Sequence, residues 1–219
     1  MSGFAGIPTE ALDFYEGLEA DNSKPYWLDH RATYDTAVRA PVEALVAELL
    51  PLVAPDAEVK VFRPYKDARR AHGPLYKTHQ GAFVEVHPGT GYYVQVSAAG
   101  LQVAAGWHPQ GAQLLRYREA VVAPTGAALD RLVEGLRGGG WRIDGGRELT
   151  RAPAGMSPDA PRIHLLRLRQ LTVRRDLDWP DWVGTPAAVD EVAALWQEVG
   201  SLVDWLADAV GPGADSAAR

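Results

Sequence analysis

Residues 81–107 read GAFVEVH-PGTG-YYVQVSA-AG-LQVAAGW. Three runs rich in β-forming residues, 81–87, 92–98 and 101–107, are separated by PGTG and by AG, which are hairpin-type breaks. Breaks this short join neighbouring strands in antiparallel order. The middle of the chain is therefore predicted to be an antiparallel β-meander.

Helical periodicity precedes this meander. After Pro8, Thr9 can cap a helix whose apolar residues at 11, 14, 15 and 18 share one face. Further helices are expected from Tyr26 through Val38 and from Pro41 onward. Residues 59–64 then alternate as in an extended strand, which adds to the predicted sheet.

Beyond the meander, helices are expected at 113–122 and 127–136, and a short hairpin of 141–143 with 148–151. A long amphipathic helix follows Thr185-Pro186. The pattern predicts an α+β fold, with a central antiparallel β-sheet covered by N-terminal helices and a long C-terminal helix. We expect one domain spanning 1–219, with 210–219 as a disordered tail.

Composition excludes several classes of function. The 219-residue chain carries a net charge of −6, which argues against a surface that binds duplex nucleic acid over its whole face. It has no cysteine, so disulfides and thiol chemistry are excluded.

No apolar run is long enough to span a membrane and no secretory signal pattern opens the chain, so we expect a cytoplasmic protein with no membrane partner. Nothing in the sequence indicates an oligomeric state.

One segment has a positive net charge although the chain as a whole is acidic. Six cations lie between residues 60 and 77 against the single anion Asp67, and they are Lys60, Arg63, Lys66, Arg69, Arg70 and Lys77. Tyrosines and histidines are interleaved with them, including Tyr76 and His79. Guanidinium groups bind phosphate or carboxylate bidentately, whereas lysine supplies a point charge. The segment therefore predicts a site for a small anion.

The same residues carry a family resemblance. The residues that carry it are Gly6-Ile7-Pro8, Asn22-Ser23-Lys24 with Trp27 and Arg31, Phe62 to Asp67, Tyr76 to His79, and Leu149 to Pro153. On these motifs the chain resembles, over nearly its full length, a bacterial family known only as domain of unknown function 2461. The resemblance implies no activity, because none is established for that family.

The match to the family motif is partial. Arg63, Lys66, Asp67, Arg69 and Tyr76 occupy matching positions, but Lys66 stands where the family has Arg. Arg70 stands where the family has Phe, and an acidic-Lys pair before Tyr76 is missing. A bidentate clamp at residue 66 is thereby lost.

Three functions remain open from the sequence. The favoured one is a binding module for a small phosphate or carboxylate ligand, contacted by Arg63, Lys66, Arg69, Tyr76 and Lys77. An enzyme at the same place would use Asp67 or His79 as general acid or base. In the third, the segment is an ion-pair staple within a structural or interaction protein.

We expect no metal and no cofactor. Four of the six histidines fall in the β-rich middle, yet none shows a recognised metal-ligand spacing. No Gly-x-Ser-x-Gly elbow is present, which argues against a serine hydrolase.

Overall fold

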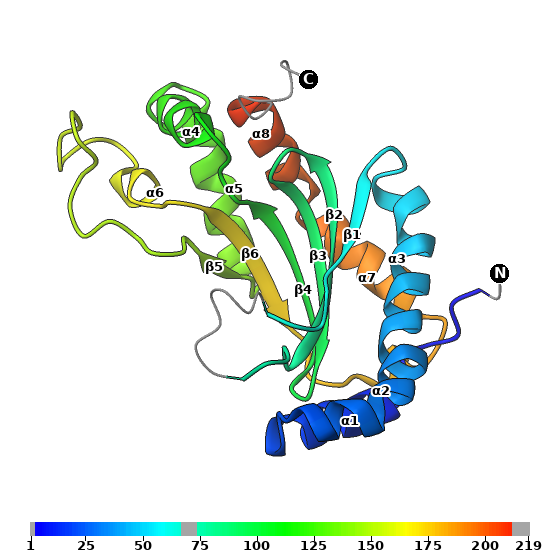
Figure 1. Cartoon of the computed structure of the whole chain (residues 1–219). Coiled ribbons are helices and arrows are strands. Elements are labelled where there is room, and N and C mark those ends of the chain that lie inside the picture. Colours follow the sequence, from blue (N-terminus) through cyan, green and yellow to red (C-terminus); the bar gives the residue numbers. More distant parts are fainter. Residues whose placement is uncertain (1–2, 67–73, 212–219) are drawn as a thin grey trace, which may run out of the picture. The chain divides into compact units, whose positions relative to one another are not determined.

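The computed structural model describes residues 3–66 and 74–211 and confirms the α+β class (Figure 1). The described strands form one six-stranded antiparallel sheet in the order β1-β2-β3-β4-β6-β5. Their bounds are β1 Glu58–Val61, β2 His79–His87, β3 Thr90–Ser97, β4 Gly100–Trp107, β5 Arg142–Asp144 and β6 Leu171–Asp176. The predicted meander is thus β2-β3-β4.

Glycine allows one of the meander turns. Gly100 opens β4 with a φ of +107°, in the left-handed region that residues with a side chain avoid. A Cβ at this position would lie 1.7 Å from the carbonyl oxygen of Asp178. The same close approach allows Leu101 to donate its N–H to the Asp178 carbonyl at 2.7 Å.

The chain divides into two compact units. Unit 1 comprises 1–84, 93–103 and 176–195, and unit 2 comprises 85–92, 104–175 and 196–219. The boundaries between the units fall within β2, β3, β4, β6 and α7.

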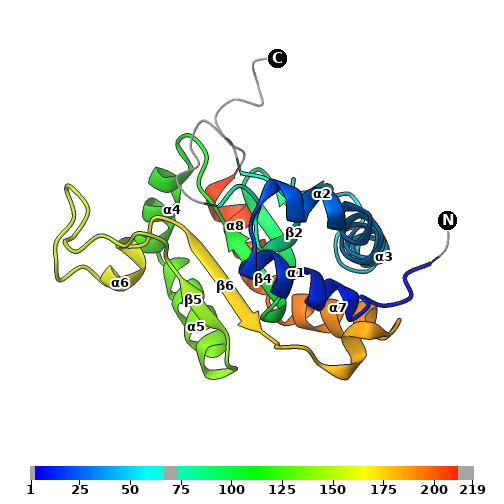
Figure 2. The ribbon, with the colours of Figure 1, turned by 60° about the horizontal axis from the view of Figure 1, so that its bottom comes forward.

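Unit 1 contains the N-terminal helices. They are α1 Glu10–Ala20, α2 Lys24–Thr33, the π-helix η1 Tyr34–Arg39 and α3 Ala40–Val53, and a 3₁₀ turn η2 Asp181–Gly184 precedes α7 Ala188–Glu198. Ser23 starts α2 by accepting the Tyr26 N–H at 3.2 Å. From residue 24 to 53 the chain stays helical without a break, and α1 packs against α2 and η1. Figure 2 shows α1, α2 and α3 from below.

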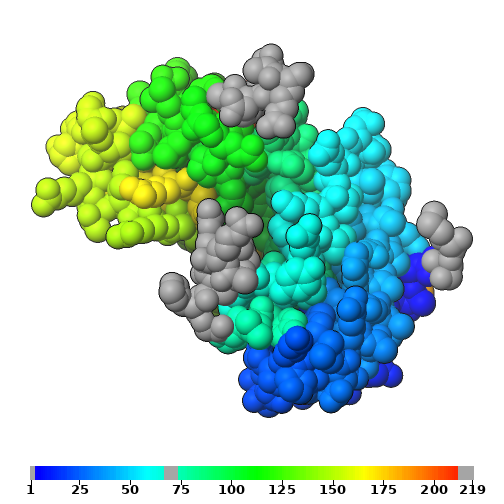
Figure 3. Space-filling view, viewed as in Figure 1, coloured from blue at the N-terminus to red at the C-terminus, as the bar shows by residue number. Residues whose placement is uncertain are grey.

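Unit 2 contains α4 Gln113–Val122, α5 Gly126–Gly138, α6 Ile163–Leu166 and α8 Gly200–Val210. Helix α4 packs against both α5 and α8. The buried Gln113 side chain accepts from Trp107 Nε1 at 3.1 Å and donates to the carbonyls of Pro88 and Gly211. This one amide ties the end of β4, the β2–β3 turn and the end of α8 together. The surface of segment 113–170 is green to yellow in Figure 3.

Three details differ from the sequence expectations. Residues 148–151 form no strand, and β5 pairs instead with β6, so that Ile143 lies opposite Val173. The long C-terminal helix is two consecutive helices, because the backbone at Val199 (φ −101°, ψ 0°) leaves helical geometry. Val210 is the last residue of α8, and the rest of the expected tail, from 212, lies outside the described residues.

Candidate anion-binding pocket

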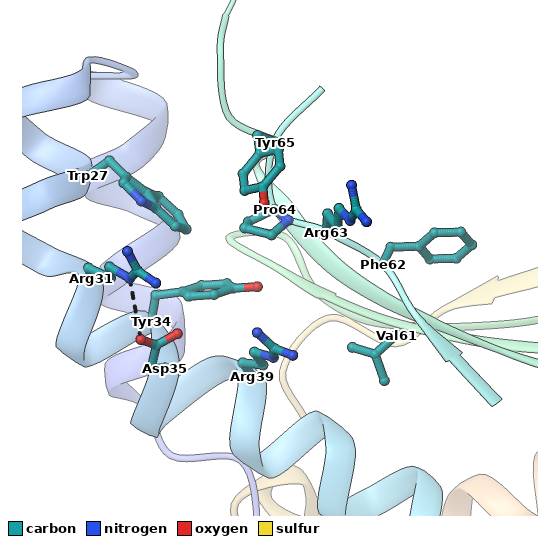
Figure 4. A pocket seen from close by; sticks show the side chains of 10 residues that line it. All are labelled: Trp27, Arg31, Tyr34, Asp35, Arg39, Val61, Phe62, Arg63, Pro64 and Tyr65. Atoms are coloured by element: carbon teal, nitrogen blue, oxygen red, sulfur yellow. Dashed lines mark ion pairs between the residues drawn. The ribbon is translucent and has the colours of Figure 1, made fainter. Parts of the chain in front are cut away.

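Unit 1 contains a pocket of about 290 Å³ between its helical stretch and the segment that follows β1. Ten residues line it: Trp27, Arg31, Tyr34, Asp35, Arg39, Val61, Phe62, Arg63, Pro64 and Tyr65. Figure 4 shows the first five on α2 and η1, with the hydroxyl of Tyr34 and the guanidinium of Arg39 pointing towards the strand segment.

The π-helix positions one wall of this pocket. In η1 each backbone hydrogen bond spans five residues instead of four, so Tyr34 and Arg39 come to the same side of the helix. In an α-helix, which completes a turn about every 3.6 residues, Arg39 would lie on a different side of the helix from Tyr34. Single π-turns inside α-helices are frequently found at functional sites. The irregular turn therefore explains why two chemically useful side chains face one pocket.

Three arginines and one aspartate give the pocket a positive lining in an acidic chain. Arg31 lies 3.6 Å from Asp35, and Arg39 donates to Glu43 at 2.8 Å. These ion pairs are about half exposed, and such pairs contribute at most about 1 kcal/mol. Among the described residues, no carboxylate pairs with Arg63. The pocket can therefore offer guanidinium groups to an anion at little cost.

Tyr34 is held in place from behind. Its hydroxyl donates to the Gln80 side chain at 2.5 Å, and the Gln80 amide donates to the carbonyls of Phe62 and Gly81 at 2.9 Å each. Burial raises the pKa of Tyr34 to about 12. The phenol is neutral at physiological pH, and it links η1 to β2 and to the pocket segment.

Trp27 belongs to the same helical wall and is supported by Tyr76. Their rings stack with centroids 4.5 Å apart and planes 9° apart. Asn22 accepts the Tyr76 backbone N–H at 2.9 Å and donates to its carbonyl at 3.1 Å, which fixes the backbone of that residue. Tyr76, predicted to contact a ligand, thus packs on the wall and is not among the ten lining residues.

The other predicted binding residues are arranged by a short backbone ladder. Tyr65 and Tyr76 form an antiparallel bridge, Lys66 donates its N–H to Leu75, and Lys77 donates to Pro64. Main-chain hydrogen bonds therefore hold the two halves of the segment together. In the described part of the chain, no ion pair involves Arg63, Lys66 or Lys77.

Lys77 and His79 lie at the second half of this segment. The ammonium groups of Lys77 and Lys60 lie 5.4 and 5.5 Å from the centroid of the Phe62 ring, which both cations therefore share. Burial and the charge of Lys60 lower the pKa of Lys77. Burial, followed by the charges of Lys77 and Lys66, lowers the pKa of His79, which starts β2. His79 is not among the ten pocket residues.

Of the predicted site residues that the structure describes, Arg63 alone lines the pocket. Asp67, Arg69 and Arg70 lie outside the described residues. The helical half of the pocket, with Tyr34, Asp35 and Arg39, was not predicted. The available signal was that Arg31, Asp35 and Arg39 repeat every four residues beside two aromatic residues, Trp27 and Tyr34.

Two features are missing from the part of the chain that the structure describes. No described helix is long and apolar enough to cross a membrane. No group of three or more metal-ligating side chains gathers within residues 3–66 and 74–211.

The pocket segment falls within a region that matches a known family. The sequence profile of the family described as "Conserved hypothetical protein (DUF2461)" matches residues 10–205, which include every pocket residue. No curated protein matches the chain. The match covers most of the sequence, and the chain belongs to the DUF2461 family of conserved hypothetical proteins.

Proposed function

We propose that this protein binds a small anionic ligand, a phosphate or carboxylate compound, in the unit 1 pocket. The observation that carries the proposal is that Arg31, Arg39 and Arg63 all line one cavity, whose lining contains a single carboxylate, that of Asp35. Arginine presents a planar fork that matches carboxylate and phosphate oxygens. A cavity of about 290 Å³ suits a compact ligand, since pockets for drug-sized molecules start near that volume.

Each pocket residue has a defined role in this proposal. Arg63 and Arg39 bind the anion, because Arg63 has no described carboxylate partner and Arg39 pairs only with the half-exposed Glu43. Arg31 also contacts the anion when its ion pair with Asp35 breaks. Trp27 and the exposed Tyr65 cover the apolar part of the ligand. The hydrogen bond from Tyr34 to Gln80 fixes the helical wall relative to the strand segment.

The lining favours binding over acid–base catalysis. None of the ten lining residues is a histidine, and the one carboxylate, Asp35, lies beside the cation Arg31. A general base needs a titratable group within hydrogen-bond reach of the proton it removes. His79 has a lowered pKa but starts a strand and does not line the cavity.

The test is titration calorimetry of the full chain with pyrophosphate and with citrate at low salt. The double variant Arg39→Gln/Arg63→Gln should weaken the binding of at least one of the two anions by about tenfold or more, because two guanidinium contacts are lost. The control, Lys24→Gln/Arg151→Gln, removes the same charge from exposed positions outside the pocket and should bind as the wild type does. Equal affinity in all three proteins, or no binding to any, contradicts the proposal.

A further inference from the structure

Four of the ten side chains that line the unit 1 pocket are aromatic, and they are Trp27, Tyr34, Phe62 and Tyr65. Binding a phosphate or carboxylate group requires none of them, because arginines alone can hold such a group. Aromatic linings are typical of pockets that enclose the apolar body of a ligand as well as its charged group. The four rings therefore indicate what the anionic group of the ligand is attached to.

Three of the four rings have aromatic partners within the fold. Trp27 stacks on Tyr76 with the ring centroids 4.5 Å apart, and its centroid lies 4.8 Å from that of Tyr34. The Phe62 ring lies 6.2 Å from the ring of Tyr93 in a tilted arrangement. These three rings are explained by the packing of unit 1, whatever the pocket binds.

Tyr65 is not explained in this way. It is 53% exposed, and within the part of the chain that the structure describes its side chain has neither a ring contact nor a hydrogen bond. Its backbone is fixed, because Tyr65 forms an antiparallel bridge with Tyr76 and the next residue, Lys66, donates its N–H to Leu75 at 3.1 Å. A tyrosine in a fixed position loses little conformational entropy when a ligand covers its ring. Tyr65 therefore offers a free aromatic face to the pocket that it lines.

The free ring lies close to the arginines of the pocket. Arg63 is two residues from Tyr65 in the segment that follows β1, so at most about 7 Å of backbone separates them. Figure 4 shows Trp27 and Tyr65 at one end of the pocket and Arg39 with Asp35 at the other. One small molecule can therefore place a ring on Tyr65 and its charged group among the guanidinium groups.

The charge of the lining distinguishes between anions. Three guanidinium groups line the pocket together with one carboxylate, that of Asp35, which leaves two net positive charges. The ammonium groups of Lys60 and Lys77 lie nearby, 5.5 and 5.4 Å from the centroid of the Phe62 ring. A phosphate monoester carries a charge of about −1.5 to −2 at pH 7, whereas a single carboxylate carries −1. The phosphate monoester therefore balances the charge of this lining better.

We propose that the ligand of this pocket is a phosphate monoester of a planar aromatic group, with its ring stacked on Tyr65 and its phosphate bound by Arg39 and Arg63. This inference rests on the anion-binding function proposed above and names the class of compound. Aryl phosphates and nucleoside monophosphates both belong to the class, because each joins a planar ring to one phosphate. The cavity of about 290 Å³ is at the lower limit for drug-sized ligands, which favours a compact member.

Titration calorimetry of the full chain at low salt compares two matched pairs of ligands. Phenyl phosphate and cyclohexyl phosphate have the same charge, and only the first has an aromatic ring. Adenosine monophosphate differs from ribose 5-phosphate by its base. The aromatic member of at least one pair should bind about fivefold or more tightly, as expected for a base stacked on an aromatic side chain. The pair that shows the preference tells whether the ring joins the phosphate directly or through a sugar.

A fifth ligand, benzoate, tests the phosphate. It should bind about fivefold or more weakly than phenyl phosphate, because it offers less negative charge to the guanidinium groups.

Three variants test whether Tyr65 is the residue responsible. Tyr65→Phe keeps the ring and should keep the preference, whereas Tyr65→Leu should reduce the ratio of the two affinities to below about twofold. Leu28→Ala changes another exposed side chain, on α2 and outside the pocket lining, and should preserve the ratio. Because Tyr65 and Leu28 are both exposed, all three variants should fold.

The outcomes separate this inference from the function on which it rests. Equal affinities within both pairs, with binding that is weakened in Arg39→Gln/Arg63→Gln, overturn the aromatic ligand and leave the anion site intact. A preference that persists in Tyr65→Leu overturns the stacking role, and benzoate that binds as tightly as phenyl phosphate overturns the phosphate. If no phosphate compound binds, or if binding is unchanged in Arg39→Gln/Arg63→Gln, the anion site itself is contradicted and this inference with it.

Discussion

The rings of Trp27 and Tyr76 stack with their planes 9° apart, which joins the first turns of α2 to the segment that precedes β2. Aromatic pairs of this kind contribute about 0.5–1.5 kcal/mol beyond the area they bury. Tyr76→Leu should therefore lower the free energy of unfolding by about 1–2 kcal/mol, measured by urea denaturation. Leu75→Ala alters the exposed neighbouring residue and serves as the control. Equal stability of the two variants would show that the stack contributes nothing.

Tyr76→Phe separates two roles of this residue. The variant keeps the stacked ring and removes only the hydroxyl. If Tyr76 serves solely to support Trp27, anion affinity and stability should match the wild type within the error of calorimetry. A loss of affinity at unchanged stability would restore the hydroxyl to the ligand-binding role expected from the sequence.

The bond from Tyr34 to Gln80 should be important for stability. Tyr34→Phe leaves the buried Gln80 Oε1 without its donor, and such a loss costs about 1–3 kcal/mol. Thermal or urea unfolding measures the effect. The control Tyr65→Phe removes a hydroxyl from an exposed tyrosine that lines the same pocket. A Tyr34→Phe protein as stable as Tyr65→Phe would refute the role given to this bond.

The raised pKa of the same tyrosine predicts that the stability of the fold depends on pH in the alkaline range. In the unfolded chain Tyr34 ionises near pH 10, whereas in the folded chain its pKa is raised to about 12. Above pH 10 the unfolded state loses this proton first, so stability falls as the pH rises from 10 to 12. Stability of Tyr34→Phe should fall less steeply over this range than that of the wild type.

The lowered pKa of His79 predicts that stability decreases as the pH falls, whereas the Tyr34 effect decreases stability as the pH rises. Its folded pKa is lowered, so below pH about 6.5 the unfolded chain takes up a proton that the folded chain does not. Stability should be fully present above that pH and decrease as the pH falls. His79→Gln should reduce this decrease, measured as urea midpoints from pH 7 to pH 5. His108→Gln, which removes an exposed histidine, is the matched control, and an identical slope in the two variants would contradict the prediction.

Two glycine substitutions should act in opposite directions. Gly100→Ala places a Cβ against the Asp178 carbonyl at a φ of +107°, and it should cost more than about 2 kcal/mol. Gly135→Ala, within α5, meets no heavy atom within 4 Å and should raise stability by about 0.5–1 kcal/mol. Thermal unfolding of both variants checks the pair. Two shifts of the same sign would contradict this prediction.

The β-meander could be predicted because its information is local. Alternating apolar residues and glycine breaks determine both the strands and their antiparallel order, and α4 was expected at the residues where it occurs. The pairing of β5 with β6 could not be foreseen in this way. Its partners Ile143 and Val173 lie thirty residues apart along the chain, and no local signal favours that pairing over a hairpin through Gly145-Gly146.

Half of the candidate site was predictable for a similar reason. Arg63 stood out because cations are dense around it in an acidic chain. Arg39 and Tyr34 lie among ordinary helical residues, and only a π-turn brings them to one side. Tyr34 also bonds to Gln80, which is 46 residues away in sequence, and no local pattern indicates a contact of this kind.

The most direct test of the pocket is a crystal structure of the full chain grown with tungstate, a heavy isostere of phosphate. Anomalous diffraction locates tungsten without reference to any assumed site. We expect a peak in the unit 1 pocket, within hydrogen-bond reach of Arg39 and Arg63, that is absent in Arg39→Gln/Arg63→Gln. An empty pocket in the wild type, under conditions in which tungstate binds elsewhere on the protein, would contradict the account.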